Sequence, residues 1–230
     1  MVHWFHPKTI MANIFMLLLV LPIHLIHGST SLPYVTCGSV VRLLNANYMT
    51  KLHSHDVKYG SGSGQQSVTG TDDDVDANSY WQIKGSTEKG CERGAPIKCG
   101  SSIRLEHIPT GKNLHSHLFS SPLSGNQEVS AFGDGGEGDT GDNWVLSCSE
   151  DLWERGVNVR FKHVDTDKWL SVSGRTYGRP ISGQMEVVGA KYQDSSCYWK
   201  TTEGVFVKPD AGKNYEETDF EDDNLIKDEL

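Results

Sequence analysis

The sequence predicts an all-β fold of about twelve short strands, because one pattern recurs three times and turn-forming residues are frequent. The chain has 24 glycines and 8 prolines in 230 residues, too many for long helices to dominate. Each copy carries a leucine followed by a small or polar alternation, and each closes on a tryptophan. These markers are Leu52, Leu114 and Leu170, and Trp81, Trp144 and Trp199. Repetition in register indicates three related structural units.

Within each copy, short β-branched and partly alternating segments predict strands. Examples lie at residues 40–44, 80–83, 143–146 and 157–161, with loops rich in Gly, Ser and Asp between them. Three copies are too few for a propeller, and an open stack would need polar capping copies. Closure on a pseudo-threefold axis removes free sheet edges. We therefore expect a β-trefoil with the repeated Trp and Leu side chains in its centre.

The two ends of the chain differ from the body in composition. Residues 1–28 have the order of a secretory signal peptide, with the apolar run 14–21 before small residues, and either Met1 or Met11 could start it. Pro22 and His24 interrupt that run, which disfavours a membrane anchor. The predicted domain covers 35–208, with copies at about 35–90, 91–150 and 151–208.

Residues 209–230 form an acidic tail that we expect to be disordered. The tail ends in Lys227, Asp228, Glu229 and Leu230, the retrieval address read by the KDEL receptor of the endoplasmic reticulum. Together with a signal peptide, this address predicts a protein of the endoplasmic reticulum lumen without a membrane span. The formal net charge of −9 argues against nucleic acid as a partner, because phosphate binding needs a basic face.

The repeated residues resemble those of the MIR-motif family. The resemblance rests on Leu-His-Ser-His at 52–55, on the Gly/Ser-rich segment 59–70 and on Trp81. Within that family the chain is similar to stromal cell-derived factor 2 and its relatives retained in the endoplasmic reticulum. The resemblance implies a β-trefoil of three MIR repeats. It also implies a partnership with a J-domain co-chaperone and the luminal Hsp70 in folding misfolded clients during the unfolded protein response.

Five cysteines leave at least one thiol unpaired in a monomer. Cys37 and Cys99 precede the first strand of their copies, while Cys91 and Cys148 follow the fourth. First and fourth strands of a trefoil copy are neighbours, so we predict the disulfides Cys37–Cys91 and Cys99–Cys148, with Cys197 free. A small Cys91–Cys99 staple remains the alternative.

Metal and catalytic signals are weak. The strand pairs His53/His55 and His115/His117 could each chelate, but serines replace both histidines in the third copy. Hydrolase and P-loop signatures are absent from the sequence, so we predict no catalytic residue, no metal and no cofactor. The run 72–74 with Asp76 lacks the rest of a calcium loop and reads as a solvated hairpin loop.

A binding surface is therefore the main functional expectation. Its candidates are aromatic residues in or near loops and the arginine repeated in each copy: Tyr59, Trp153, Trp169, Tyr177, Arg42, Arg104 and Arg160. For the arginines, paired framework charges are the stronger interpretation. Three functions compete: a non-enzymatic adaptor for the J-domain co-chaperone, a lectin-like module for O-mannosyl or other glycans, and an accessory enzyme of glycosyl transfer, which no paired carboxylates support.

Overall fold

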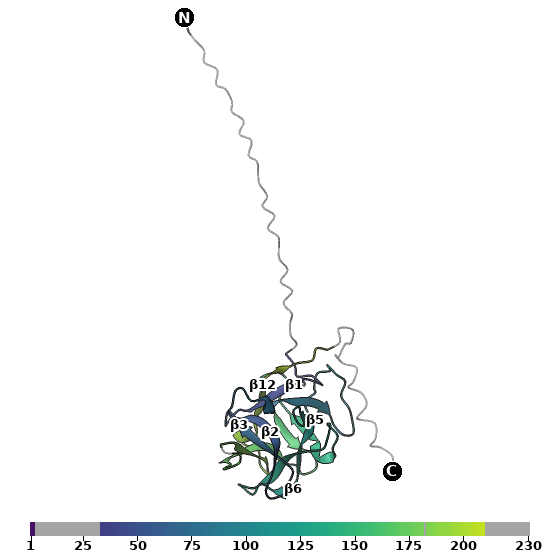
Figure 1. Ribbon diagram of the computed structural model, residues 1–230. Coiled ribbons are helices and arrows are strands. Elements are labelled where there is room, and N and C mark those ends of the chain that lie inside the picture. Colours follow the sequence, from purple (N-terminus) through teal and green to yellow (C-terminus); the bar gives the residue numbers. More distant parts are fainter. Residues whose placement is uncertain (3–32, 182, 210–230) are drawn as a thin grey trace, which may run out of the picture. The chain divides into compact units, whose positions relative to one another are not determined.

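The structure is a computed structural model that describes residues 1–2, 33–181 and 183–209 (Figure 1). The predicted signal peptide beyond Val2 and the predicted tail beyond Pro209, including the retrieval address, lie outside the described residues. Within the described part, the chain is all-β apart from three short 3-10 helices. None of its described helices has the length and apolar character needed to cross a membrane.

The described residues form twelve strands, four in each copy, as the repeated pattern predicts. The first copy contains β1 (Val40–Asn45), β2 (Lys51–Lys58), β3 (Gln66–Thr71) and β4 (Trp81–Gly85). The second contains β5 (Ser102–His107), β6 (Lys112–Ser120), β7 (Gln127–Phe132) and β8 (Trp144–Ser147). The third contains β9 (Arg160–His163), β10 (Trp169–Thr176), β11 (Met185–Ala190) and β12 (Trp199–Val205).

Strand β9 begins later than the expected segment 157–161. Gly156 has a φ of 73° and belongs to a turn, so the chain is not yet extended at residue 157. Val159 forms an isolated bridge with Trp199, and the regular strand starts at Arg160.

The first and fourth strands of the three copies pair around a closed circuit. The pairings run β1–β4, β4–β5, β5–β8 and β8–β9, and β12 returns to β1. The bridge between Val159 and Trp199 joins β9 to β12 and completes the circuit. The second and third strands of each copy form a hairpin, and β3, β7 and β11 of the three hairpins pair with one another.

The repeated tryptophans and leucines lie in the core. Trp81, Trp144 and Trp199 are fully buried. Each indole N–H donates to the backbone carbonyl of the leucine in its own copy: Leu52 at 2.9 Å, Leu114 at 3.0 Å and Leu170 at 2.9 Å. A buried indole needs such an acceptor, because an unpaired polar group in the core costs about 1–3 kcal/mol. The repeated Trp and Leu positions of the sequence therefore make the same core contact in each copy.

A 3-10 helix precedes the fourth strand of every copy, which the sequence interpretation missed. Asp76, Asp139 and Asp194 cap these helices by accepting a hydrogen bond from the backbone two residues later. An aspartate therefore stands at the same place before each repeated tryptophan, and this pattern is visible in the sequence.

One polar side chain per copy holds the 3-10 helix of the preceding copy, the third copy being the one that precedes the first around the circuit. Asn45 donates to the carbonyl of Ser196 at 2.6 Å. His107 and His163 occupy the same strand ends in copies two and three, and their Nε2 atoms lie 2.9 Å and 2.8 Å from the carbonyls of Asn78 and Gly141. Burial lowers the pKa of both histidines, that of His107 to about 4, so these rings are held neutral.

The two disulfides predicted from the repeat are present. Cys37 is joined to Cys91 and Cys99 to Cys148, which excludes the alternative Cys91–Cys99 staple. Each bridge ties the segment before the first strand of a copy to the segment after its fourth. Cys197 is a free cysteine and is buried.

Candidate functional site

Two aromatic residues expected on the surface are instead buried. Trp153 has no exposed area and packs edge-on against Phe161, with ring centroids 5.6 Å apart. Tyr59 is 7% exposed, and its hydroxyl lies 2.9 Å from the carbonyl of Val68 and 3.0 Å from that of Val129. Neither ring can stack on a ligand, so the expectation was wrong for both residues. The loop position in the sequence did not reveal that these loops fold over the core.

Tyr177 lies beside Tyr59, with ring centroids 6.4 Å apart, and is half-buried. Burial raises the pKa of the Tyr177 phenol, and the nearby carboxylate of Glu186 raises it further. The buried Glu186 accepts hydrogen bonds from the backbone N–H groups of Leu123 at 2.7 Å and Ser124 at 3.2 Å. These contacts join the loop of the second hairpin to β11.

The repeated arginines of the first two copies are held by the protein itself. Arg42 is 3% exposed, pairs with Glu203, and donates to the carbonyl of Asp74 at 2.8 Å and to that of Asp76. Arg104 donates to the carbonyls of Gly85 at 2.9 Å and Gly136 at 3.1 Å. The loop 72–76 thus covers Arg42 through its backbone carbonyls, while its residues 72–75 are exposed, as expected of a solvated hairpin loop. These contacts match the framework interpretation and leave Arg42 unavailable to a ligand.

Arg160 of the third copy has a different environment. Its guanidinium carbon lies 5.2 Å from the ring centroid of Trp169 and 5.3 Å from that of Tyr198. Trp169 is half-buried and Tyr198 is 37% exposed. Lys162 Nζ lies 5.8 Å from the Trp169 ring and pairs with Asp167 at 2.7 Å. We call Arg160, Lys162, Trp169 and Tyr198 the Arg160 site; it combines two cations with two accessible aromatic rings.

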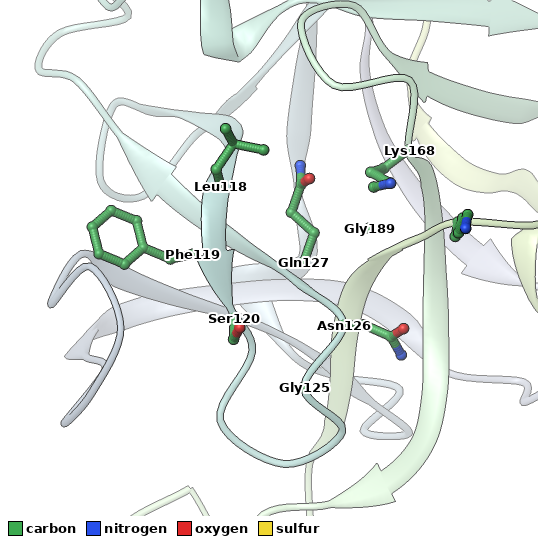
Figure 2. A pocket seen from close by; sticks show the side chains of 9 residues that line it. Leu118, Phe119, Ser120, Gly125, Asn126, Gln127, Lys168 and Gly189 are labelled. Atoms are coloured by element: carbon green, nitrogen blue, oxygen red, sulfur yellow. The ribbon is translucent and has the colours of Figure 1, made fainter.

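A pocket of about 290 Å³ lies between the second hairpin and the third copy (Figure 2). Figure 2 shows Leu118 and Phe119 on one side of it and Lys168 on the other, with Gln127 between them. Leu118 is 86% and Phe119 49% exposed, and Lys191 also lines the pocket. We call it the Phe119 pocket. Apolar side chains left in water beside lysines are suited to an apolar and acidic partner.

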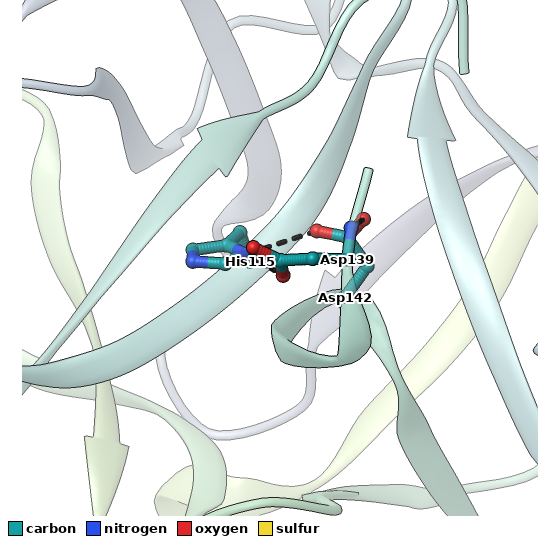
Figure 3. A group of neighbouring side chains, drawn as sticks. All are labelled: His115, Asp139 and Asp142. Carbon is teal, nitrogen blue, oxygen red and sulfur yellow. Dashed lines mark hydrogen bonds and ion pairs between the residues drawn. The ribbon is translucent and has the colours of Figure 1, made fainter. Parts of the chain in front are cut away.

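One cluster has the residue types of a metal site (Figure 3). The ligand atoms of His115, Asp139 and Asp142 lie within 4.8 Å of one another, and His115 Nδ1 is 2.9 Å from Asp142 Oδ1. However, the Asp142 carboxylate also accepts from the backbone N–H of Asp139 at 3.0 Å and from Asn113 Nδ2 at 3.1 Å. Asp139 accepts from the N–H of Gly141 at 2.9 Å. This network is a capping box that fixes a 3-10 helix, and helix capping explains it without an ion.

The first copy has a related histidine network. His53 Nδ1 lies 2.7 Å from Asp76 Oδ2, and His53 Nε2 lies 2.6 Å from His55 Nδ1. Burial lowers the pKa of His55, and the neighbouring His53 lowers it further. Burial alone would raise the pKa of Asp76, but the hydrogen bonds from Ser79, His53 and the Asn78 backbone outweigh it and lower that pKa. Because Asp76 also caps its 3-10 helix, the network is part of the framework.

The chain is similar to known proteins over most of its length. Residues 33–171 match the MIR domain family, so this is a MIR-domain protein. Stromal cell-derived factor 2 of Mus musculus is 61% identical over 182 residues, which cover 79% of this chain and 86% of that protein. The chain therefore belongs to the stromal cell-derived factor 2 family.

Solved structures agree with this assignment. The crystal structure of the SDF2-like protein from Arabidopsis thaliana is 45% identical, has a TM-score of 0.74, and covers 76% of this chain and 98% of its own. The protein O-mannosyltransferase Pmt1–Pmt2 complex of S. cerevisiae, bound to the sugar donor, matches with a TM-score of 0.66 at 24% identity. That match covers 78% of this chain and 27% of the other, and it shows a shared fold.

Several residues of the two surfaces were missed by sequence interpretation. Leu118, Phe119, Lys168 and Lys191 come from two copies and meet only in the folded chain. Tyr198 immediately precedes a repeated tryptophan, where Tyr80 and Asn143 stand in the other copies. Tyr198 could therefore have been found from its repeated position before the tryptophan. No sequence pattern indicates the residues of the pocket.

Proposed function

We propose that the chain is a non-enzymatic adaptor of the endoplasmic reticulum lumen that binds a J-domain co-chaperone. Through that co-chaperone it supports folding of misfolded clients by the luminal Hsp70, as part of the unfolded protein response. Membership of the stromal cell-derived factor 2 family supports this choice of partner. The motif at 227–230 and the apolar run at 14–21 support the luminal location, and replacing the motif should send the protein into the medium.

The domain that carries this function is, we propose, a β-trefoil of three MIR repeats at about 35–90, 91–150 and 151–208. The closed circuit of first and fourth strands supports this proposal, as do the three hairpins whose third strands pair with one another. The three equivalent indole hydrogen bonds support it as well. Such a scaffold is rigid, so its loops and strand ends hold the binding surfaces in place.

The Phe119 pocket is the observation that carries the adaptor function. Leu118 and Phe119 are adjacent and both exposed. Neighbouring apolar side chains that are exposed to water usually mark a contact surface. Lys168 and Lys191 add positive charge, while the lining residues include no carboxylate. A polypeptide partner with an apolar side chain flanked by acidic ones would complement this surface in both respects.

A binding measurement tests the proposal. The full chain, the Leu118→Ser/Phe119→Ser variant and a matched control would each be mixed with the purified J-domain co-chaperone. Val75→Ser is the control, because Val75 is 89% exposed and lies outside the pocket. The proposal predicts binding by the wild type and the control and weaker binding by the pocket variant. Absence of binding by the wild type would overturn it.

A carbohydrate-binding module is the second candidate function. The half-buried ring of Trp169 and the exposed ring of Tyr198 favour it, because aromatic faces can stack on sugar rings. A glycan array probed with the full chain decides this case. Hits with O-mannosyl glycans would support a lectin, and a blank array would dismiss it.

A further inference from the structure

We propose that the Arg160 site binds carboxylate side chains of an acidic polypeptide segment. The proposal rests on a comparison of the three copies and not on the identity of the J-domain partner. Each copy has an arginine at the same place in its first strand, yet the copies treat that arginine differently. In the first two copies a loop covers the arginine, and these copies serve as references for the third, in which the arginine is not covered.

In the first two copies, the loop before the 3-10 helix covers the arginine. Four residues, 72–75, separate β3 from the cap Asp76, and six, 133–138, separate β7 from the cap Asp139. Arg42 donates to carbonyls of the first loop and Arg104 to the carbonyl of Gly136 in the second. The Nη atoms that make these bonds already have their acceptors, and Arg42 Nε, which has none, is buried away from any ligand.

The residue before the repeated leucine binds the same loops. Lys51 Nζ lies 2.7 Å from Asp74 Oδ1 and 3.3 Å from the carbonyl of Asp73. Asn113 Nδ2 lies 3.1 Å from the carbonyl of Gly136. The side chains of Lys51 and Asn113 thus bind the loop of their own copy. They are therefore not available as donors for a ligand beside Arg42 or Arg104.

The third copy lacks this closure. Three residues, 191–193, separate β11 from the cap Asp194, which makes this the shortest of the three loops. Trp169 replaces Lys51 and Asn113 and has no cationic or amide group to bind a loop. Within the described part of the chain, Arg160 makes one long hydrogen bond, from Nη2 to Ser147 Oγ at 3.4 Å, and no ion pair. Most of its N–H donors remain available.

The chemistry of these groups selects a carboxylate. A guanidinium presents a planar fork that matches a carboxylate with two hydrogen bonds, and stacking on aromatic rings orients the fork in advance. A neutral sugar would also need acceptors, but Asp167, the carboxylate beside the site, is already paired with Lys162. Arg160 and Lys162 both lie over the Trp169 ring and compete with a sugar for it.

The surroundings favour an extended polypeptide over a small anion. Lys168 precedes Trp169 in the chain, and Lys191 follows Ala190, which pairs with Trp169 across β10 and β11. The two lysines that line the Phe119 pocket are therefore chain neighbours of the Arg160 site, but they project from the opposite face of these strands. A ligand that contacts the arginine and the lysines together must pass around the ends of β10 and β11, which a polypeptide segment with several acidic residues can do and a small anion cannot.

Fluorescence anisotropy with the full chain tests the proposal. The probe is a fluorescein-labelled peptide, Glu-Phe-Glu-Glu-Leu-Glu-Glu-Phe-Glu, and its match has Gln at every Glu. We expect the acidic peptide to bind about tenfold more tightly than the match, because several charge-assisted hydrogen bonds are lost. Arg160→Gln should weaken the acidic peptide by about tenfold, with an unfolding midpoint to verify folding.

Arg104→Gln is the matched control. It changes the same repeated position in a copy whose arginine is bound to the protein's own carbonyls, so peptide affinity should stay unchanged. Equal binding of the acidic and glutamine peptides would overturn the proposal without any variant. So would an Arg160→Gln chain that keeps full affinity, or a site that binds mannobiose and not the acidic peptide.

Discussion

Removing either disulfide should cost the chain about the same free energy of unfolding. The Cys37–Cys91 bridge spans 54 residues and the Cys99–Cys148 bridge spans 49. In the chain-entropy treatment, closing a loop of either length stabilises the folded state by about 4 kcal/mol, and the two values differ by only about 0.1 kcal/mol. The double variants Cys37→Ala/Cys91→Ala and Cys99→Ala/Cys148→Ala should therefore lose about 4 kcal/mol each.

The arrangement of the loops extends this prediction. The loop 37–91 ends before residue 99, so the two loops follow one another and do not overlap. Their effects on the unfolded chain should add, and the variant without either bridge should lose about 8 kcal/mol. Because domains have about 5–15 kcal/mol of stability in total, this variant should be close to unfolding.

Urea unfolding followed by tryptophan fluorescence measures these losses. Cys197→Ala is the control, because it leaves both bridges in place and should cost about 1 kcal/mol for one lost buried sulfur. The reasoning would be refuted by a loss below about 1 kcal/mol for either double variant, or by losses that differ severalfold between the two bridges.

Two further predictions concern His107 and Trp169. Because the pKa of His107 is lowered to about 4, mainly by burial, protonation below its ordinary value of 6.5 favours the unfolded chain. Its contribution is complete above pH 6.5, and about 3 kcal/mol should be lost as the pH falls to 4. His107→Asn, which copies Asn45, should flatten that part of the pH profile of urea unfolding; an unchanged profile contradicts this. In a Trp4→Phe chain, the ratio of iodide to caesium quenching for Trp169 should be about threefold higher than the same ratio for free N-acetyltryptophanamide, because Arg160 attracts anions. Equal ratios for the protein and the free indole would contradict the second prediction.

The regular parts of the fold could be predicted because they repeat. A strand has a local signature, and its recurrence three times in register located Trp81 and its two equivalents in the core. The disulfides followed from the same regularity, because the ends of first and fourth strands meet when those strands pair. Both inferences used positions that are equivalent in every copy.

The surfaces could not be predicted because they depend on differences among the copies. Trp153 and Tyr59 look like loop aromatics in sequence, but their burial is set by contacts with Phe161 and with Val129, which are not adjacent in sequence. Arg42 is covered because the loop 72–76 folds over it, and the path of that loop cannot be predicted from its composition. Leu118 meets Lys168 only after two copies pack together.

We propose that this chain acts by binding another polypeptide, the J-domain co-chaperone of the folding machinery. Sedimentation velocity of the purified chain mixed with the purified J-domain co-chaperone tests this claim most directly. At micromolar concentrations we expect one faster boundary that contains both proteins, retained by Val75→Ser and diminished by Leu118→Ser/Phe119→Ser. Two boundaries that sediment independently, at the rates of the separate proteins, would contradict the account.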